Sequence, residues 1–172
     1  DPYFLQYGTR QGDGYLRLAL AEFLSKQYKT AVDMSDLFIT NGASMGLALA
    51  CSLFTQPGDA ILVEEPSYFL ALKVFADYHL KPIAIPIDHN GLIIESLEEA
   101  LRQHKPRWLY TIPTFQNPSA ITLSEERRKR LVELSKEYRF LIVADEVYHF
   151  LNYTVPSPTP MATFIKQGNV LS

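Results

Sequence analysis

Two carboxylates and a tyrosine follow a run of apolar residues in the segment FLIVADEVYHF, which covers residues 140–150. The apolar run ends at Asp145, and Glu146 and Tyr148 come directly after it. A carboxylate at the end of such a run is partly removed from water, so it needs a partner that keeps it ionised. Three kinds of partner would suit Asp145: a metal ion, a basic side chain or a protonated ring nitrogen.

A second segment suited to chemistry is TNGASMG, residues 40–46, where a short apolar run turns into a helical pattern. Gly42, Ala43 and Ser44 leave the backbone N–H groups open to a ligand, and the positive end of a helix dipole favours an anion. The segment therefore predicts a phosphate site, although a glycine needed only for the tight turn would give the same pattern.

Tyr68 and Asn117 are two further candidates. Tyr68 begins a helical pattern, where its flat ring could stack on an aromatic ligand or could simply join the core. Asn117 precedes Pro118, which favours an extended backbone and an amide that presents both donor and acceptor. The alternative for Asn117 is an ordinary turn-forming residue.

The segment LIVADE also fits the magnesium-binding strand of phosphate-loop ATPases. Those proteins pair this strand with a G-x-x-x-x-G-K-[ST] loop, whereas the glycines of residues 40–46 have no lysine beside them. We therefore expect no metal site and rank the ATPase below the other hypotheses.

The elements that must position these residues alternate along the chain. Short apolar runs predict strands at 36–40, 60–65, 81–86, 107–113 and 140–146. Helical periodicity predicts helices at 12–28, 43–55, 68–78, 94–104 and 124–138. Asp13 and Ser124 are the expected N-caps of the first and last of these helices.

This alternation predicts an α/β domain with a mainly parallel sheet and helices on both faces, because the strands are apolar throughout rather than at every second residue. In open α/β sheets, ligands bind beyond the carboxyl ends of the strands. Gly42, Tyr68, Asn117 and Asp145 all follow expected strands, so we expect them at one edge of the sheet.

Composition places the chain among globular proteins. It has 172 residues, 47% of them hydrophobic and 20% charged, and a net charge of −3, which gives no polybasic surface for nucleic acid or an anionic membrane. No apolar stretch approaches the roughly 18 residues that a membrane-spanning helix needs. The single cysteine, Cys51, favours a buried, inert thiol and a reducing compartment, so we expect a cytoplasmic protein.

Taken together, these segments resemble the large domain of the fold-type I pyridoxal-phosphate enzymes, specifically the class I/II aminotransferases. The resemblance is carried by YGTRQGDGYLRLALAEFL, FITNGASMGLALA, DAILVEEPSYF, YTIPTFQNPSAITLSEERRKRLVELSKEY and LIVADEVYHFL. They occur in the family's order with family-like spacing. The similarity is greatest to the branch with the 2-aminoadipate and kynurenine aminotransferases and the aminotransferase-like domains of some bacterial transcription regulators.

The resemblance implies that pyridoxal 5'-phosphate is the cofactor and gives the candidate residues roles around its ring. Asp145 would pair with the protonated ring nitrogen. Asn117 and Tyr148 would hydrogen-bond the phenolic oxygen, and Tyr68 would stack on the ring face. Glu146 would have no direct role toward the cofactor and would be structural.

The resemblance also implies that Ala43 and Ser44 bind the cofactor phosphate, largely through main-chain N–H groups. Where relatives commonly have Gly-Ser-Gln, this chain has Gly42, Ala43 and Ser44, so one side-chain hydroxyl is missing or shifted by a position. Tyr7 resembles the tyrosine that reaches the phosphate from the neighbouring subunit, which implies a homodimer.

We expect a lead-in segment at residues 1–12 and a cofactor-binding large domain at 13–172. The family's Schiff-base lysine lies in a Ser-x-x-Lys stretch beyond a strand that resembles NVLS, and the arginine that grips the substrate carboxylate lies farther on. Both would then lie beyond Ser172, and the chain alone would be incomplete and inactive.

The function that the resemblance implies is transfer of an amino group between an amino acid and a 2-oxo acid. Two alternatives stay open: a ligand-sensing domain of a transcription regulator, and another fold-type I pyridoxal-phosphate enzyme, such as a lyase or a decarboxylase.

Overall fold

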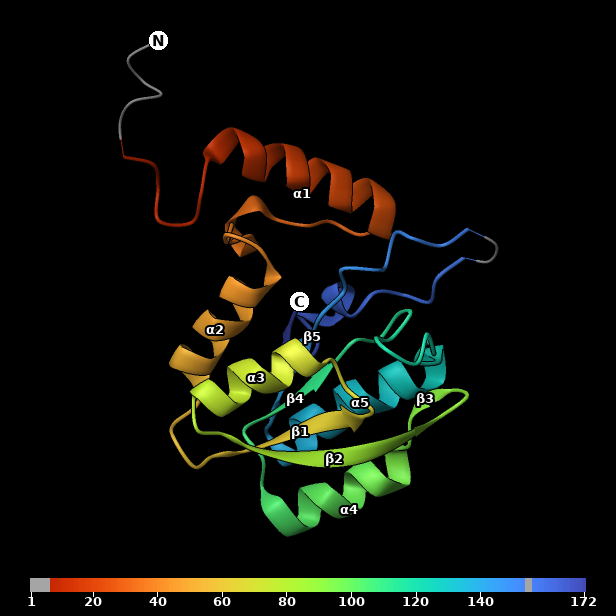
Figure 1. Cartoon of the computed structure of the whole chain (residues 1–172). Coiled ribbons are helices and arrows are strands. Elements are labelled where there is room, and N and C mark those ends of the chain that lie inside the picture. The colour runs from red at the N-terminus through yellow and green to blue at the C-terminus, as the bar shows by residue number, and fades with distance from the viewer. Residues whose placement is uncertain (1–6, 154–155) are drawn as a thin grey trace.

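The computed structural model describes residues 7–153 and 156–172 (Figure 1). Residues 1–6 of the expected lead-in segment lie outside the described residues. The strands are β1 (Ala60–Glu65), β2 (Lys81–Asp88), β3 (Gly91–Leu92), β4 (Trp108–Thr111), β5 (Leu141–Ala144) and β6 (Val170–Leu171). The helices are α1 (Gly14–Tyr28), α2 (Ala43–Phe54), α3 (Phe69–Asp77), α4 (Ile94–His104) and α5 (Glu125–Tyr138), with short 3-10 helices η2 (Met34–Asp36) and η3 (Met161–Phe164).

The six strands form one sheet in the order β3-β2-β1-β4-β5-β6. Every neighbouring pair is parallel except β2 and β3. From β1 the chain adds strands first on one side, with β2, and later on the other, with β4 and β5. The sheet therefore has a switch point between β1 and β4, and a crevice at the carboxyl ends of these strands is the usual ligand site of such folds.

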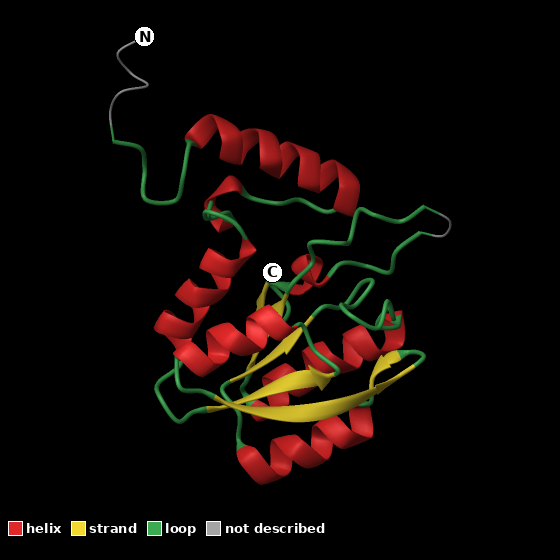
Figure 2. Ribbon diagram, viewed as in Figure 1, coloured by secondary structure: helices red, strands yellow, loops and turns green. Residues whose placement is uncertain are grey.

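Helices cover both faces of the sheet, as Figure 2 shows. Leu62 of β1 packs in the core with residues of α4 and α5, whereas its neighbours Ile61 and Val63 pack with residues of α2 and α3. Successive side chains of a strand point to opposite faces, so the central strands β1, β4 and β5 are buried on both sides. The prediction of an α/β domain with a mainly parallel sheet and helices on both faces is confirmed.

The strand expected at residues 36–40 is wrong. Asp36 ends η2, and residues 37–40 belong to no strand. The N–H of Ile39 donates to the carbonyl of Gln11 at 2.9 Å, so this segment pairs with a loop near the N-terminus instead of with the sheet.

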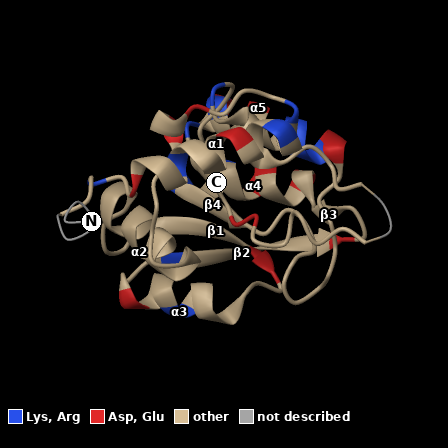
Figure 3. Cartoon of the chain, turned by 90° about the horizontal axis from the view of Figure 1, so that it is seen from above, with Lys and Arg blue, Asp and Glu red and all other residues tan. Residues whose placement is uncertain are grey.

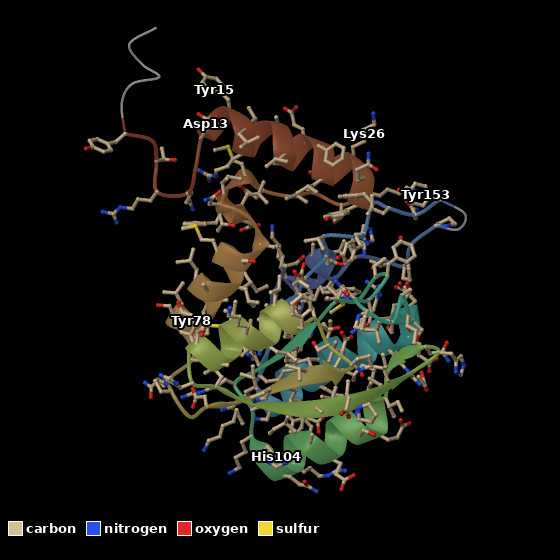
Figure 4. The ribbon with its side chains drawn as sticks, viewed as in Figure 1. Asp13, Tyr15, Lys26, Tyr78, His104 and Tyr153 are labelled. Atoms are coloured by element: carbon tan, nitrogen blue, oxygen red, sulfur yellow. The ribbon has the colours of Figure 1, made fainter. Side chains whose placement is uncertain are left out.

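Helix α1 lies away from the sheet, at the top of Figure 1. Asp13 caps it, as expected, by accepting from the N–H of Leu16 at 2.8 Å, and Figure 4 labels Asp13 at this end of the helix. Ser124 caps α5 in the same way through the N–H of Arg127. At the far end of α1, Tyr28 stacks on Phe150 with ring centroids 5.8 Å apart, which joins the helix to the segment after β5.

Charged side chains lie on the helices of the protein, and the thiol of Cys51 lies in its core. Acidic and basic residues both occur along α5 and α4 in the view of Figure 3. No helix among residues 7–153 and 156–172 is long and apolar enough to cross a bilayer. Cys51 is fully buried in the core between the sheet and α2, and burial raises the pKa of its thiol to about 11, as an inert thiol requires.

Candidate active site

A cavity of about 210 Å³ opens at the carboxyl ends of β1, β4 and β5. It is lined by six of the residues that the sequence singled out: Gly42, Ala43, Ser44, Tyr68, Asp145 and Tyr148. The volume is below the ~300–1,000 Å³ of typical complete ligand pockets, so these residues make one wall of a site.

A larger hollow of about 460 Å³ lies at the opposite edge of the sheet, near the starts of β4 and β5. Its lining includes Arg102, Lys105 and Arg139, which belong to the ends of α4 and α5. Cations are common at helix C-termini because they offset the negative end of the dipole. The smaller cavity is the candidate site, because its position and its chemical groups both fit a ligand.

The start of α2 supplies open N–H groups to this cavity. Gly42 precedes the helix with φ 83° and ψ 166° and offers no side-chain cap. This backbone conformation is essentially restricted to glycine, and no heavy atom lies within 4 Å of where a Cβ would be. In the described part of the chain no acceptor meets the N–H groups of Ala43 and Ser44, so they are free to bind an anion.

Asp145 follows β5 directly and is held by two adjacent residues of β4. Its backbone N–H donates to the carbonyl of Thr111 at 2.9 Å. The hydroxyl of Tyr110 donates to its Oδ2 at 2.9 Å. Tyr110 is only 1% exposed, and burial, followed by the nearby Asp145 carboxylate, raises the pKa of Tyr110 well above its usual value. Its hydroxyl therefore remains protonated and available as a donor.

Asn117 and Tyr148 meet beside the cavity. The amide nitrogen Nδ2 of Asn117 donates to the hydroxyl of Tyr148 at 3.3 Å, although the two residues are separated by 31 positions in the chain. The loop that carries Asn117 is fixed by Gln116, whose side-chain amide donates to the carbonyl of Pro66 at 2.7 Å. The structure thus brings the amide of Asn117 and the phenol of Tyr148 together beside the cavity.

Tyr68 and Tyr7 differ in how they relate to the cavity. Tyr68 is half-buried, directly precedes α3, and packs edge-on to Phe69 with ring centroids 5.6 Å apart. Tyr7 does not line the cavity and is fully exposed.

Glu146 does not line the cavity; its carboxylate contacts backbone N–H groups of the protein instead. Its carboxylate accepts from the N–H groups of Met161 at 2.9 Å and Ala162 at 3.0 Å, at the start of η3. The guanidinium of Arg128 lies 3.7 Å away. These contacts fix the turn that follows β5.

Arg128 and Glu64 were missed by sequence reasoning. Arg128 is fully buried in the described structure, and its guanidinium donates to the carbonyls of Leu123 and Thr159 and to the Thr114 hydroxyl. Glu64, at the end of β1, accepts from Thr111 Oγ1 at 2.6 Å. A carboxylate directly after the apolar run AILV was the available signal for Glu64, since such a group requires partners when it is buried.

The chemistry of this edge favours an anionic aromatic ligand: helix-end N–H groups for an anion, an aromatic ring to stack, and a carboxylate for a cationic or protonated nitrogen. A metal has less support. Within residues 7–153 and 156–172, no three His, Cys, Asp or Glu side chains lie close enough together to hold a metal ion.

Comparison with known proteins gives consistent relatives. Residues 2–171 match the family described as aminotransferase class I and II. The chain is 41% identical over 172 residues to aromatic-amino-acid aminotransferase 1 of Thermococcus litoralis, covering 97% of this chain and 41% of that protein. It is 33% identical over 167 residues to the uncharacterized HTH-type transcriptional regulator YisV of Bacillus subtilis, covering 97% of this chain and 34% of that protein.

Among solved structures, Pyrococcus horikoshii kynurenine aminotransferase in complex with PMP matches with a TM-score of 0.89 and 39% identity. The match covers 96% of this chain and 42% of that one. The chain therefore spans less than half the length of the relatives that it matches.

Proposed function

The chain belongs to the class I and II aminotransferase family, and from this premise we propose that the whole protein is an aminotransferase that moves an amino group from an amino acid to a 2-oxo acid. The resemblance drawn from the sequence is confirmed at the level of the family. Its members depend on pyridoxal 5'-phosphate, so this is the cofactor to test against the site.

The donor set of the cavity fits that cofactor. Two unpartnered N–H groups at the start of α2 suit a phosphate, and the open backbone at Gly42 lets it approach closely. The ring of Tyr68 suits a stacked pyridine, and the Asp145 carboxylate suits a protonated ring nitrogen. The single observation that carries the proposal is that these groups, dispersed over a hundred positions of sequence, line one cavity.

Each residue would then have a distinct task. Ala43 and Ser44 would bind the phosphate through their main-chain N–H groups. Asp145 would hold the proton on the ring nitrogen, and Tyr148 with Asn117 would hydrogen-bond the phenolic oxygen. When bound, the cofactor supplies an electron-withdrawing ring that stabilises negative charge on the substrate's α carbon.

Proton transfer at the α carbon would come from a residue that the described cavity does not contain, since none of the residues lining it is a lysine. We place the family's lysine and the substrate-binding arginine beyond Ser172 in the whole protein. Residues 13–172 would form the cofactor-binding large domain, and residues 1–12 would lead into it.

We further propose a homodimer in the cytoplasm. Tyr7 is fully exposed and so could reach a second subunit's phosphate site, and α1 carries exposed apolar side chains at Tyr15, Leu18 and Phe23, which favour association. The free, buried Cys51 is consistent with a reducing compartment.

The test of the function compares Asp145→Asn with Glu146→Gln in the full-length protein. A hydrogen bond to a charged group contributes about 1.5–3 kcal/mol, so Asp145→Asn should weaken cofactor binding about 10- to 100-fold and slow amino transfer with little change in thermal stability. Glu146→Gln should lower thermal stability and leave cofactor affinity nearly unchanged, because Glu146 contacts only the protein's own groups among the described residues. Equal losses of cofactor affinity in the two variants would contradict the assignment.

A second candidate is a ligand-sensing domain of a transcription regulator, which the similarity to the Bacillus regulator favours. It predicts cofactor binding without amino transfer, and a DNA-binding module in the full-length protein. Amino transfer by the purified full-length protein would decide against it.

A further inference from the structure

Tyr110 is the described side chain that holds the Asp145 carboxylate from inside the protein. It belongs to β4, and its hydroxyl donates to Oδ2 of Asp145 at 2.9 Å across 35 positions of sequence. Tyr110 does not line the cavity, whereas Asp145 does. The hydroxyl of Tyr110 therefore acts on a ligand in the cavity through the carboxylate that it contacts.

The ring of Tyr110 is fixed on the protein side. Phe75 of α3 packs edge-on against it, with centroids 5.4 Å apart and planes at 72°. Phe75 is fully buried and also packs against Trp108 at 6.0 Å. Tight packing leaves the ring little freedom, so the hydroxyl has a fixed position toward Asp145.

Asp145 is anchored at two points by neighbouring residues of β4. The carbonyl of Thr111 accepts its backbone N–H, and the hydroxyl of Tyr110 donates to Oδ2. Among residues 7–153 and 156–172, no hydrogen-bond donor meets the other oxygen, Oδ1. One oxygen is thus occupied by the protein, and the other is left for a ligand.

We propose that Tyr110 is a positioning residue for cofactor binding: its hydroxyl fixes the rotamer of Asp145 so that Oδ1 meets the protonated nitrogen of the cofactor ring. The inference rests on the proposed function, because it deepens the role of Asp145 in the same site. Tyr148 has a different role, since it lines the cavity itself and its hydroxyl accepts from Asn117. The two tyrosines would therefore act on different atoms of the ring, Tyr148 directly and Tyr110 through a carboxylate.

A purely structural role for the same bond is the alternative, because buried tyrosine hydroxyls usually find a partner. In that case removal of the hydroxyl would change folding stability but would leave the cofactor's environment unchanged. The readouts that separate the two are cofactor affinity and the protonation of the cofactor ring nitrogen, followed by its nitrogen chemical shift.

The experiment uses Tyr110→Phe in the full-length protein, with Tyr78→Phe as the matched control. Tyr78 directly follows α3 (Figure 4), does not line the cavity, and packs against the same core as Tyr110. We expect Tyr110→Phe to weaken binding of pyridoxal 5'-phosphate about tenfold and to shift the ring nitrogen resonance toward that of the unprotonated ring. Tyr78→Phe should change neither quantity.

A double-mutant cycle with Asp145→Asn tests whether Tyr110 acts through the carboxylate. The effect of Tyr110→Phe on affinity should disappear in the Asp145→Asn background; an undiminished effect there would overturn the proposal. So would an unchanged affinity and an unchanged resonance in the single variant. If Asp145→Asn alone changes neither cofactor affinity nor the resonance, the proposed role of Asp145 is wrong. That result differs from a failure of the Tyr110 proposal, in which Asp145→Asn has its expected effect and Tyr110→Phe has none.

Should Tyr110→Phe not fold, ortho-fluorotyrosine introduced at position 110 keeps the ring and makes the hydroxyl a stronger donor. A shift of the ring nitrogen resonance would support the proposal, and an unchanged resonance would overturn it.

Discussion

The buried carboxyl of Glu64 makes the stability of the protein depend on pH in a direction that can be measured. Glu64 is 3% exposed at the end of β1. It accepts from the Thr111 hydroxyl at 2.6 Å and from the N–H of Ile112 at 3.1 Å. Burial nevertheless raises the pKa of Glu64 from 4.5 to about 7, because these hydrogen bonds oppose the loss of hydration only in part.

The sign and size of the effect follow from proton binding. The folded protein keeps a proton on Glu64 that the unfolded chain has already released, so the stability linked to this proton is complete below pH 4.5 and is lost as the pH rises through about 7. A pKa difference of this size corresponds to about 3 kcal/mol in the free energy of unfolding.

Glu64→Gln should remove this pH dependence. Glutamine keeps the shape and stays neutral; its carbonyl can accept from the N–H of Ile112, and its amide can donate to the Thr111 hydroxyl once that group rotates. Between about pH 5 and about pH 8, we expect the wild-type protein to lose about 3 kcal/mol relative to the variant.

The assay is equilibrium urea unfolding over a series of pH values, followed by far-ultraviolet circular dichroism. Glu65→Gln is the matched control, because Glu65 is the next residue of β1 and is exposed; its pH profile should run parallel to that of the wild type. If the profile of Glu64→Gln also ran parallel to the wild type, the reasoning about burial would be refuted.

Two further predictions concern the backbone and the buried cation, each measured by urea unfolding. Gly42→Ala should lower the free energy of unfolding by about 1–3 kcal/mol through backbone strain alone, since an added Cβ meets no atom. The control Gly46→Ala, inside α2, should be neutral or slightly stabilising. Equal effects of the two substitutions would contradict the argument from backbone strain. Arg128→Met should cost about 3–5 kcal/mol because it leaves Glu146 and several carbonyls without their buried partner. Lys129→Met, whose side chain is 62% exposed, should change the free energy of unfolding by less than about 0.5 kcal/mol, and a loss of similar size in both variants would show that burial is not the cause.

Part of the cavity lining could be predicted from the sequence because Tyr68, Asp145 and Tyr148 come after apolar strands. In a parallel sheet the carboxyl ends of the strands meet at one edge, so Tyr68 after β1 and Asp145 after β5 were expected together. The expectation needed no knowledge of side-chain contacts. It depended only on the order of strands and helices, which apolar periodicity indicates well.

Tyr110 and Glu64 could not be assigned in the same way because their roles come from partners far along the chain. Tyr110 meets Asp145 across 35 positions, and Glu64 meets Thr111 across 47. In the sequence, Tyr110 is one of several apolar residues of a buried strand. The register between β4 and β5, which sets Tyr110 opposite Val143, is what brings its hydroxyl to the carboxylate.

The prediction of a strand at residues 36–40 was wrong for a related reason. Its composition is typical of a strand, but a strand exists only where a neighbouring strand supplies hydrogen bonds, and β-propensity depends strongly on that context. Here the neighbour is the loop that contains Gln11. Apolar runs at the edges of a domain are therefore weaker indicators than those in its centre.

The two adjacent carboxylates after β5 illustrate how one segment serves both stability and chemistry. Successive side chains in an extended segment point to opposite faces, so Asp145 lies on the side of Tyr110 and the cavity, and Glu146 lies on the side of η3. Glu146 accepts from the N–H groups of Met161 and Ala162 and from the Ser172 hydroxyl, and it lies beside Arg128. These contacts commit it to the protein's own groups and fix the turn on which Asp145 sits. The rigid turn and the bond to Thr111 hold the backbone of Asp145, and the Tyr110 hydroxyl holds its Oδ2. The position of Oδ1 is then set before any ligand arrives, and a preorganised charge of this kind binds more strongly than one that must first be ordered.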